Sequence, residues 1–272
     1  MSLNATYDAY VPSSFKEFFA KAKFQPAYTP FNDIRLKTLT PAQQSSFDLA
    51  QKITVPGMFH HSIRCFYFSL LMLRNGFPSN TPGVPQISSE ELVNRVFHAC
   101  ILHDLGMTQH SSALSHPACG MSFELHGGIM AYEHLKDMEP KLLPEQLGDI
   151  VQGIMLHTIP FTTGRSSATG FLVQLSAFFD LQGYQGLGTS LAHVFDKQTV
   201  REIEKKYPRG SLVTEIVDQL HGQIKEKPNC LLSHMVRCLP TQMGASSHDT
   251  RTPIKPLEFA SRAAAIKSLL AE

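Results

Sequence analysis

The sequence predicts an all-α protein that folds as a single helical bundle. Helix-starting signals recur along the chain, apolar residues repeat at helical spacing between them, and no alternating apolar run is long enough to indicate a β-strand. With 272 residues, of which 43% are hydrophobic, the chain can bury a large core. Its formal charge of +1 gives no electrostatic reason to expect nucleic acid or a membrane surface as a partner.

The chain divides into three parts. Residues 1–39 are irregular and contain several prolines, so we expect an N-terminal arm that packs on the bundle. Residues 40–237 make up the bundle, and residues 238–272 form a loose connection followed by a helix that packs on the same domain. The helices expected along the chain cover residues 41–53, 58–75, 89–103, 123–136, 144–157, 171–184, 197–206, 211–225 and 256–271.

Local signals mark where several of these helices begin and end. Thr40, which a proline follows, can cap the first long helix, and Ser88 opens a capping box. The helix over residues 58–75 is apolar nearly all round, which predicts that it is buried at the centre of the bundle. Gly106 ends the helix that Ser88 opens, and a long polar loop follows over residues 106–121.

The cysteines indicate a reducing, cytoplasmic location. There are five, none forms a CxxC pair, and several lie in apolar helical stretches where a reduced, buried thiol is usual. The N-terminus lacks the charged head and apolar segment of a secretory signal, and the most apolar run, residues 65–73, is too short to cross a membrane. We therefore expect a cytoplasmic protein that acts on a small molecule, and the sequence is compatible with a homo-oligomer.

The pair His103-Asp104 is the clearest chemical signal in the chain. It offers an imidazole nitrogen and a carboxylate oxygen, both of which bind divalent metals, at the end of an apolar helix. Adjacent side chains on a helix point about 100° apart, so a metal there needs ligands from other elements. His61 and Asp180 lie in apolar helical stretches elsewhere, and a carboxylate in such surroundings calls for a cation. His60 competes with His61 for the ligand role.

The order of these residues resembles the metal-binding signature of the HD-domain superfamily, a group of helical metalloproteins. The flanking residues resemble those of the fungal cyanamide hydratases, over roughly residues 45–230. The pieces HSxR and SFExxGG are the most specific. The segments that carry the resemblance are Phe59–Arg64, Ile101–Asp104, Met121–Ile129, His157 and Gln174–Asp180.

The resemblance implies an HD-domain helical bundle that holds one divalent metal, expected to be zinc, between its central helices. The implied activity is that of a hydratase (a lyase) that adds metal-activated water to a small nitrile-like substrate, as in the conversion of cyanamide to urea. His157 and Glu124 would be the catalytic residues, and the loop residues Thr163 and Arg165 would contact the substrate. Arg64 would be an ion-pair partner. The implied metal ligands are His61, His103, Asp104 and Asp180.

Two departures from the hydratase pattern leave the substrate open. Gly120 stands where a lysine is expected, and His126 stands where an aromatic residue is expected. With His126 as an additional ligand, Asp104 would bridge two metals, as in the dinuclear HD-domain proteins. The alternatives are therefore a phosphohydrolase or phosphodiesterase, a diiron oxygenase with two irons or other divalent ions, and a domain that only binds a ligand. The phosphohydrolase alternative lacks the lysine that often follows the His-Asp pair, because Met107 follows Gly106.

Overall fold

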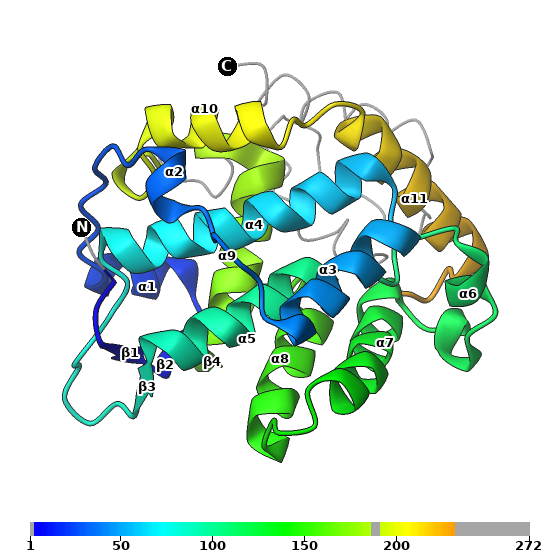
Figure 1. Cartoon of the computed structure of the whole chain (residues 1–272), viewed down its shortest axis with the longest axis horizontal. Helices are drawn as coiled ribbons and strands as arrows, with labels where there is room; N and C mark the ends of the chain where they lie inside the picture. Colours follow the sequence, from blue (N-terminus) through cyan, green and yellow to red (C-terminus); the bar gives the residue numbers. More distant parts are fainter. Residues whose placement is uncertain (1–2, 186–190, 232–272) are drawn as a thin grey trace, which may run out of the picture.

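The computed structural model describes residues 3–185 and 191–231, and within these ranges the chain is predominantly α-helical (Figure 1). The all-α prediction is therefore confirmed. The helix expected over residues 256–271 and the connection over residues 238–253 lie outside the described residues. The division of the chain at residues 39 and 237 stays a prediction.

Each helix predicted inside the described ranges corresponds to one of the longer helices of the structure. These longer helices are α3 (Pro41–Ile53), α4 (Pro56–Asn75), α5 (Ser89–Leu102), α7 (Phe123–Met138), α8 (Pro144–Leu156), α9 (Ala168–Gln182), α10 (Lys197–Lys206) and α11 (Leu212–Glu226). The shorter ones are α1 (Phe15–Lys21), α2 (Phe31–Ile34), α6 (Ser111–Leu114) and the 3-10 helices Pro117–Gly120, Gly183–Gln185 and Leu191–His193.

Thr40 and Ser88 cap their helices as predicted, but of these two only Thr40 forms the full capping box. The Glu91 carboxylate, which would close the box at Ser88, accepts hydrogen bonds from Arg95 and Gln146 instead. The Thr40 hydroxyl accepts the Gln43 N–H at 3.1 Å, and the Gln43 side chain accepts the Thr40 N–H in return. The Ser88 hydroxyl accepts the N–H of Glu91 at 3.2 Å. The predicted loop over residues 106–121 contains α6 and a 3-10 helix, each of four residues, which are too short to show a helical period in the sequence.

Two short antiparallel strand pairs tie the N-terminal segment to the bundle. Strand β1 (Thr6–Asp8) pairs with β3 (Gln86–Ser88), and β2 (Tyr10–Pro12) pairs with β4 (Arg165–Ser167). The sequence did not indicate them, because three residues cannot establish an alternating pattern. Tyr7, on β1, is fully buried, and its hydroxyl donates to the Leu73 carbonyl of α4. The pairing therefore joins residues before α1 to two distant loops.

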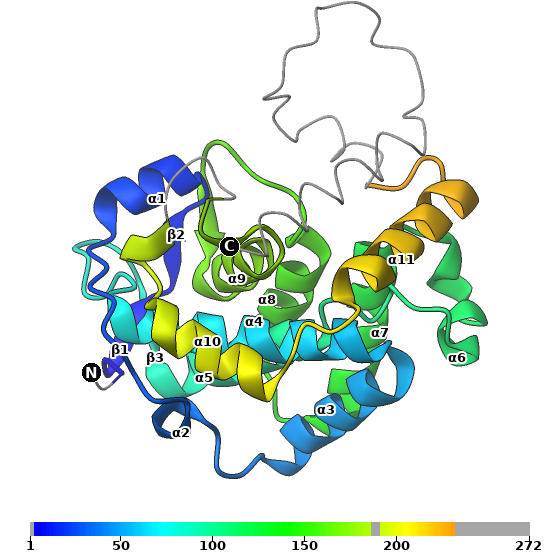
Figure 2. The same cartoon turned by 90° about the horizontal axis from the view of Figure 1, so that it is seen from above.

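Helix α4 lies at the centre of the bundle, as its apolar composition predicts. It contacts α5, α9, α10 and α11, and nearly all of its residues are buried. Figure 1 shows α10 and α11 along one side of α4, with α7 and α8 on the opposite side. The view from above in Figure 2 shows α8 beside α9, which it contacts. Helix α5 contacts both α4 and α8.

Gly106 allows the chain after α5 to lie directly against α7. A Cβ atom at this position would overlap the Phe123 carbonyl oxygen and would lie 2.8 Å from the Gly127 amide nitrogen. Only a residue without a side chain fits there. Among the described residues, no helix is both long and apolar enough to cross a membrane.

Candidate metal centre

Side chains from three helices converge at one buried point. His61 lies near the start of α4, His103 directly follows α5, and His157 directly follows α8. With Asp104, these residues are at most 5% exposed. The structure therefore brings together residues from three distant places in the sequence.

Two of the histidines are oriented in the same way, by the carbonyl groups at a helix end. The Nδ1–H of His103 donates to the Cys100 carbonyl, and the Nδ1–H of His157 donates to the Ile154 carbonyl, each at 2.7 Å. Carbonyls in the last turn of a helix lack the usual partner four residues on, so they can accept these bonds, and the Ile154 carbonyl also accepts the backbone N–H of His157 at 3.5 Å. Because Nδ1 carries the proton in each neutral ring, Nε2 keeps a lone pair that can bind a metal.

The free nitrogens face one another and the carboxylate. The Nε2 atoms of His61 and His103 are 3.2 Å apart. The Oδ2 atom of Asp104 lies 3.1 Å from His103 Nε2 and 3.6 Å from His61 Nε2. Neighbouring ligands of a tetrahedral zinc ion, each about 2.1 Å from the ion, are about 3.4 Å apart. These three atoms therefore fit around one divalent ion. The other oxygen, Asp104 Oδ1, lies 3.7 Å from His157 Nε2.

The charges of the cluster also suit a cation. Burial raises the pKa of the Asp104 carboxyl, but attraction to His103 and His61 outweighs burial and lowers the pKa well below its ordinary value. Burial lowers the pKa of His61 and brings the pKa of His157 down to about 4. Burial also opposes a charge on His103, yet Asp104 raises the pKa of that ring overall. The cluster thus combines an ionised carboxylate with imidazoles, two of which have pKa values lowered by burial, and such a buried group can hold a metal ion.

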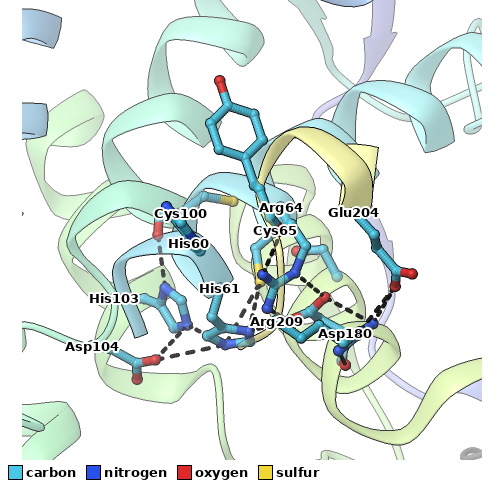
Figure 3. Close-up of polar contacts among 12 residues, drawn as sticks. His60, His61, Arg64, Cys65, Cys100, His103, Asp104, Asp180, Glu204 and Arg209 are labelled. Atoms are coloured by element: carbon cyan, nitrogen blue, oxygen red, sulfur yellow. Dashed lines mark hydrogen bonds and ion pairs between the residues drawn. The ribbon is translucent and has the colours of Figure 1, made fainter. Parts of the chain in front are cut away.

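Asp180 lies on the other side of the His61 ring (Figure 3). Its carboxylate accepts the Nδ1–H of His61 at 2.6 Å and two hydrogen bonds from Arg64, each at 2.8 Å. Arg209 Nη2 lies 3.2 Å from the same carboxylate. Burial raises the pKa of Asp180, but the two arginines outweigh it and keep the carboxylate ionised. The ion pair expected for Arg64 is confirmed, and the metal-ligand role of Asp180 stays a prediction.

His60 and His61 point in different directions. The Nδ1–H of His60 donates to the Pro208 carbonyl at 3.0 Å, whereas His61 faces His103. The structure therefore orients His61, and not its neighbour, toward the cluster.

Glu124 is buried near the start of α7 and close to the cluster. Its carboxylate accepts hydrogen bonds from the hydroxyls of Ser122 and Thr158, the second at 2.7 Å. Thr158 follows His157 directly in the chain. Burial raises the pKa of Glu124, and the negative charge of Asp104 contributes to the same shift. The hydrogen bonds from Ser122 and Thr158 act in the opposite direction, and burial outweighs them.

The structure does not bring His126 to the cluster. Its ring lies beside that of His116, with 5.3 Å between the centroids. Burial brings its pKa down to about 4, with further contributions from Lys227 and His116. The ring is 2% exposed, and among the described residues neither of its nitrogens has a hydrogen-bond partner.

Thr163 and Arg165 line a different space. They belong to the wall of a cavity of about 840 Å³, which also includes Arg95 and Asp149, and none of the four clustered residues lines it. Arg95 and Asp149 form an ion pair in this wall, with 2.9 Å between Nη1 and Oδ2.

Two residues near the cluster were not predicted from the sequence. Arg209 contacts Asp180 from a turn between α10 and α11, and nothing in the local sequence indicates this long-range pair. Cys65 lies one helical turn after His61, with its Sγ 3.7 Å from His61 Nε2. Its spacing of four residues from a predicted ligand could have identified it, because such residues share a helix face.

Two characterised yeast proteins are similar to this chain. They are the cyanamide hydratases DDI2 and DDI3 of Saccharomyces cerevisiae, each 27% identical over 160 residues. The chain resembles the cyanamide hydratases. The matched region covers 59% of this chain and 62% of either yeast protein, so it spans less than two thirds of their length. No protein-family model matches the chain.

Proposed function

We propose that this chain is a metal-dependent hydratase with an HD-domain bundle, which adds water to cyanamide or a similarly small nitrile. The observation that carries the proposal is the buried convergence of His61 Nε2, His103 Nε2 and Asp104, in a chain that resembles the cyanamide hydratases. In this reaction, the water oxygen bonds to the nitrile carbon, both protons of water end on nitrogen, and cyanamide becomes urea.

The proposed ligands are His61, His103 and Asp104, and zinc is the proposed metal. Such an ion supplies Lewis acidity, which activates water near neutral pH and polarises a bound nitrile. Asp180, Arg64 and Arg209 support the centre from the other side of His61: the carboxylate holds the ring by its Nδ1–H, and the arginines keep the carboxylate ionised.

His157 and Glu124 would move protons during the reaction. His157 is held with Nε2 unprotonated by its Nδ1 bond to the Ile154 carbonyl, so it can accept a proton from the attacking water. Glu124 has a pKa raised by burial, so it can carry a proton that is delivered to the substrate nitrogen. The hydroxyls of Ser122 and Thr158 hold its carboxyl in place.

Thr163 and Arg165 have no part in this proposal, because the cavity that they line does not include the clustered residues. The two-metal alternatives need His126 beside Asp104. His126 instead lies beside His116, and burial together with the charge of Lys227 lowers its pKa, so its surroundings give these alternatives no support.

The direct test is to incubate zinc-loaded protein with cyanamide and to measure urea. We expect turnover by the wild type and by His60→Ala, whose side chain faces Pro208, and none by His103→Ala. Absence of urea at high enzyme concentration, in wild-type protein shown to hold zinc, would contradict cyanamide as the substrate. Activity of zinc-free His103→Ala equal to that of the wild type would contradict the metal-dependent mechanism.

A further inference from the structure

The serine at the start of α7 does not cap its helix. The backbone angles of Ser122 (φ −51°, ψ 144°) are close to those of Ser88, which caps α5 (φ −64°, ψ 149°). At α1, α5 and α9 the serine in this position accepts the N–H three residues on, whereas the Ser122 hydroxyl accepts no N–H of its helix. This hydroxyl therefore points elsewhere, although a cap would stabilise α7.

Two other contacts hold the Ser122 hydroxyl. It donates to one oxygen of the Glu124 carboxylate, and it accepts the backbone N–H of Leu231, with 3.1 Å between nitrogen and oxygen. Leu231 is 109 residues away along the chain. Because a backbone N–H can only donate, this contact occupies a lone pair of the hydroxyl and leaves its proton for the carboxylate. Thr158 donates to the other carboxylate oxygen at 2.7 Å.

The N–H of Leu231 belongs to the turn that follows α11, residues 227–231, which we call the strap. The Cys230 N–H donates to the Lys227 carbonyl at 3.0 Å, which closes the turn. The side chain of Cys230 is buried in one apolar cluster with Phe123, the first residue of α7. The ring of Phe123 lies 5.8 Å from that of His157. The strap therefore packs against the start of α7, beside the proposed centre.

We propose that the strap is a positioning element of the active site: through Ser122, the Leu231 N–H fixes the Glu124 carboxyl for proton transfer. This inference rests on the proposed function, in which Glu124 delivers a proton to the substrate nitrogen. Leu231 acts through Ser122 and is not itself a catalytic residue. If the strap is lifted, the hydroxyl is free to turn back and cap α7. Seating of α11 and the strap is thereby coupled to the catalytic carboxyl.

Leu231→Pro tests this contact, because proline has no N–H to donate, and Leu231→Ala is the matched control that keeps the N–H. In the zinc-loaded full chain, Leu231→Pro should lower kcat for urea formation about tenfold, with KM and zinc content unchanged. Leu231→Ala should stay within about twofold of the wild type. Ser122→Ala should lose at least as much activity as Leu231→Pro, and Ser122→Thr, which keeps a hydroxyl, should restore most of it.

The titration of Glu124 gives a readout that a purely structural role of Leu231 would not move. The hydrogen bond from Ser122 lowers the pKa of Glu124, whereas burial and the charge of Asp104 raise it. The charge of Lys227, in the strap, also acts on this carboxyl. Carbon NMR, with Glu124→Gln to identify the signal, should show a higher Glu124 pKa in Leu231→Pro than in Leu231→Ala. The same pKa and the same kcat in both variants would overturn the proposal.

Hydrogen exchange decides the matter even if Leu231→Pro does not fold. The Leu231 amide should exchange slowly in the wild type and at least about tenfold faster in Ser122→Ala. Exchange in the wild type at the rate of a fully exposed amide would overturn the proposal. If the wild type forms no urea, the proposed function fails. A protected Leu231 amide and a shifted Glu124 pKa would then still show that the strap holds this carboxyl through Ser122.

Discussion

At the scale of single residues, the centre depends on how each imidazole proton is held. His103 and His157 give their Nδ1 protons to helix-end carbonyls, and His61 gives its proton to Asp180. These bonds leave three Nε2 atoms free in a space that also contains the Asp104 carboxylate. Residues that orient a ligand affect metal affinity less than the ligands do, and this difference can be measured.

Asp180→Asn is expected to weaken metal binding about 10- to 100-fold, because the amide holds the His61 Nδ1–H and the two arginines less strongly. The affinity can be measured by competition with a chelator. Asp149→Asn is the matched control, since Asp149 pairs with Arg95 at the separate cavity and should leave the affinity unchanged. A loss well beyond this range would instead favour the ligand role that the sequence predicts for Asp180.

Glu124→Gln should leave the metal content unchanged and slow urea formation about 100-fold or more, since the amide cannot transfer a proton. The Ser122 and Thr158 hydroxyls can still donate to the amide oxygen, so the fold should persist. Steady-state rates and zinc content measured on the same sample test this. Full activity of the variant would remove Glu124 from the mechanism.

At the scale of helices, the ends of α5 and α8 position the residues of the centre. α5 and α8 stop at His103 and His157, and the turn after α5 approaches α7 at Gly106. This approach fixes the position of Asp104 relative to Glu124, which lies in the first turn of α7.

Gly106→Ala is expected to destabilise the protein by several kcal/mol, because the added Cβ would overlap the Phe123 carbonyl, which is backbone and cannot rotate away. The change should lower the thermal midpoint by several degrees. Gly120→Ala is the matched control, since a Cβ there meets no atom within 4 Å. Equal midpoints for the two variants would show that the turn can move away from α7.

Most helix positions could be predicted from the sequence, because the signals that start and end a helix are local. Thr40 and Ser88 cap the helices that they were expected to cap. The strand pairs were missed because pairing between Val11 and Ser166 has no local signal. Likewise, the His103-Asp104 pair is visible as a dipeptide, whereas the contact of Arg209 with Asp180 arises only when distant turns meet.

At the scale of the whole molecule, the metal-free protein contains buried histidines. Protonation of these rings destabilises the folded state. The pKa values of His157 and His126 are each lowered to about 4, chiefly by burial. Between about pH 6.5 and pH 4 the unfolded chain therefore binds more protons than the folded chain. The free energy of unfolding should fall as the pH falls through this window.

His61 adds to this effect, since burial lowers its pKa, whereas the raised pKa of His103 opposes it. Each pKa unit corresponds to about 1.4 kcal/mol, so the total change should reach a few kcal/mol. Denaturant unfolding in chelator at several pH values measures it. A free energy of unfolding that stays constant from pH 7 to pH 4 would contradict the buried, neutral state of these rings.

The proposed activity requires that His61, His103 and Asp104 hold a single divalent metal. The most direct test is the metal content per chain of purified protein, measured by mass spectrometry after zinc loading and desalting. We predict about one zinc per chain in the wild type and in His60→Ala, and close to none in His103→Ala or Asp104→Ala. Wild-type protein without bound metal, or His103→Ala with as much zinc as the wild type, would contradict the claim; two irons per chain would favour the dinuclear oxygenase.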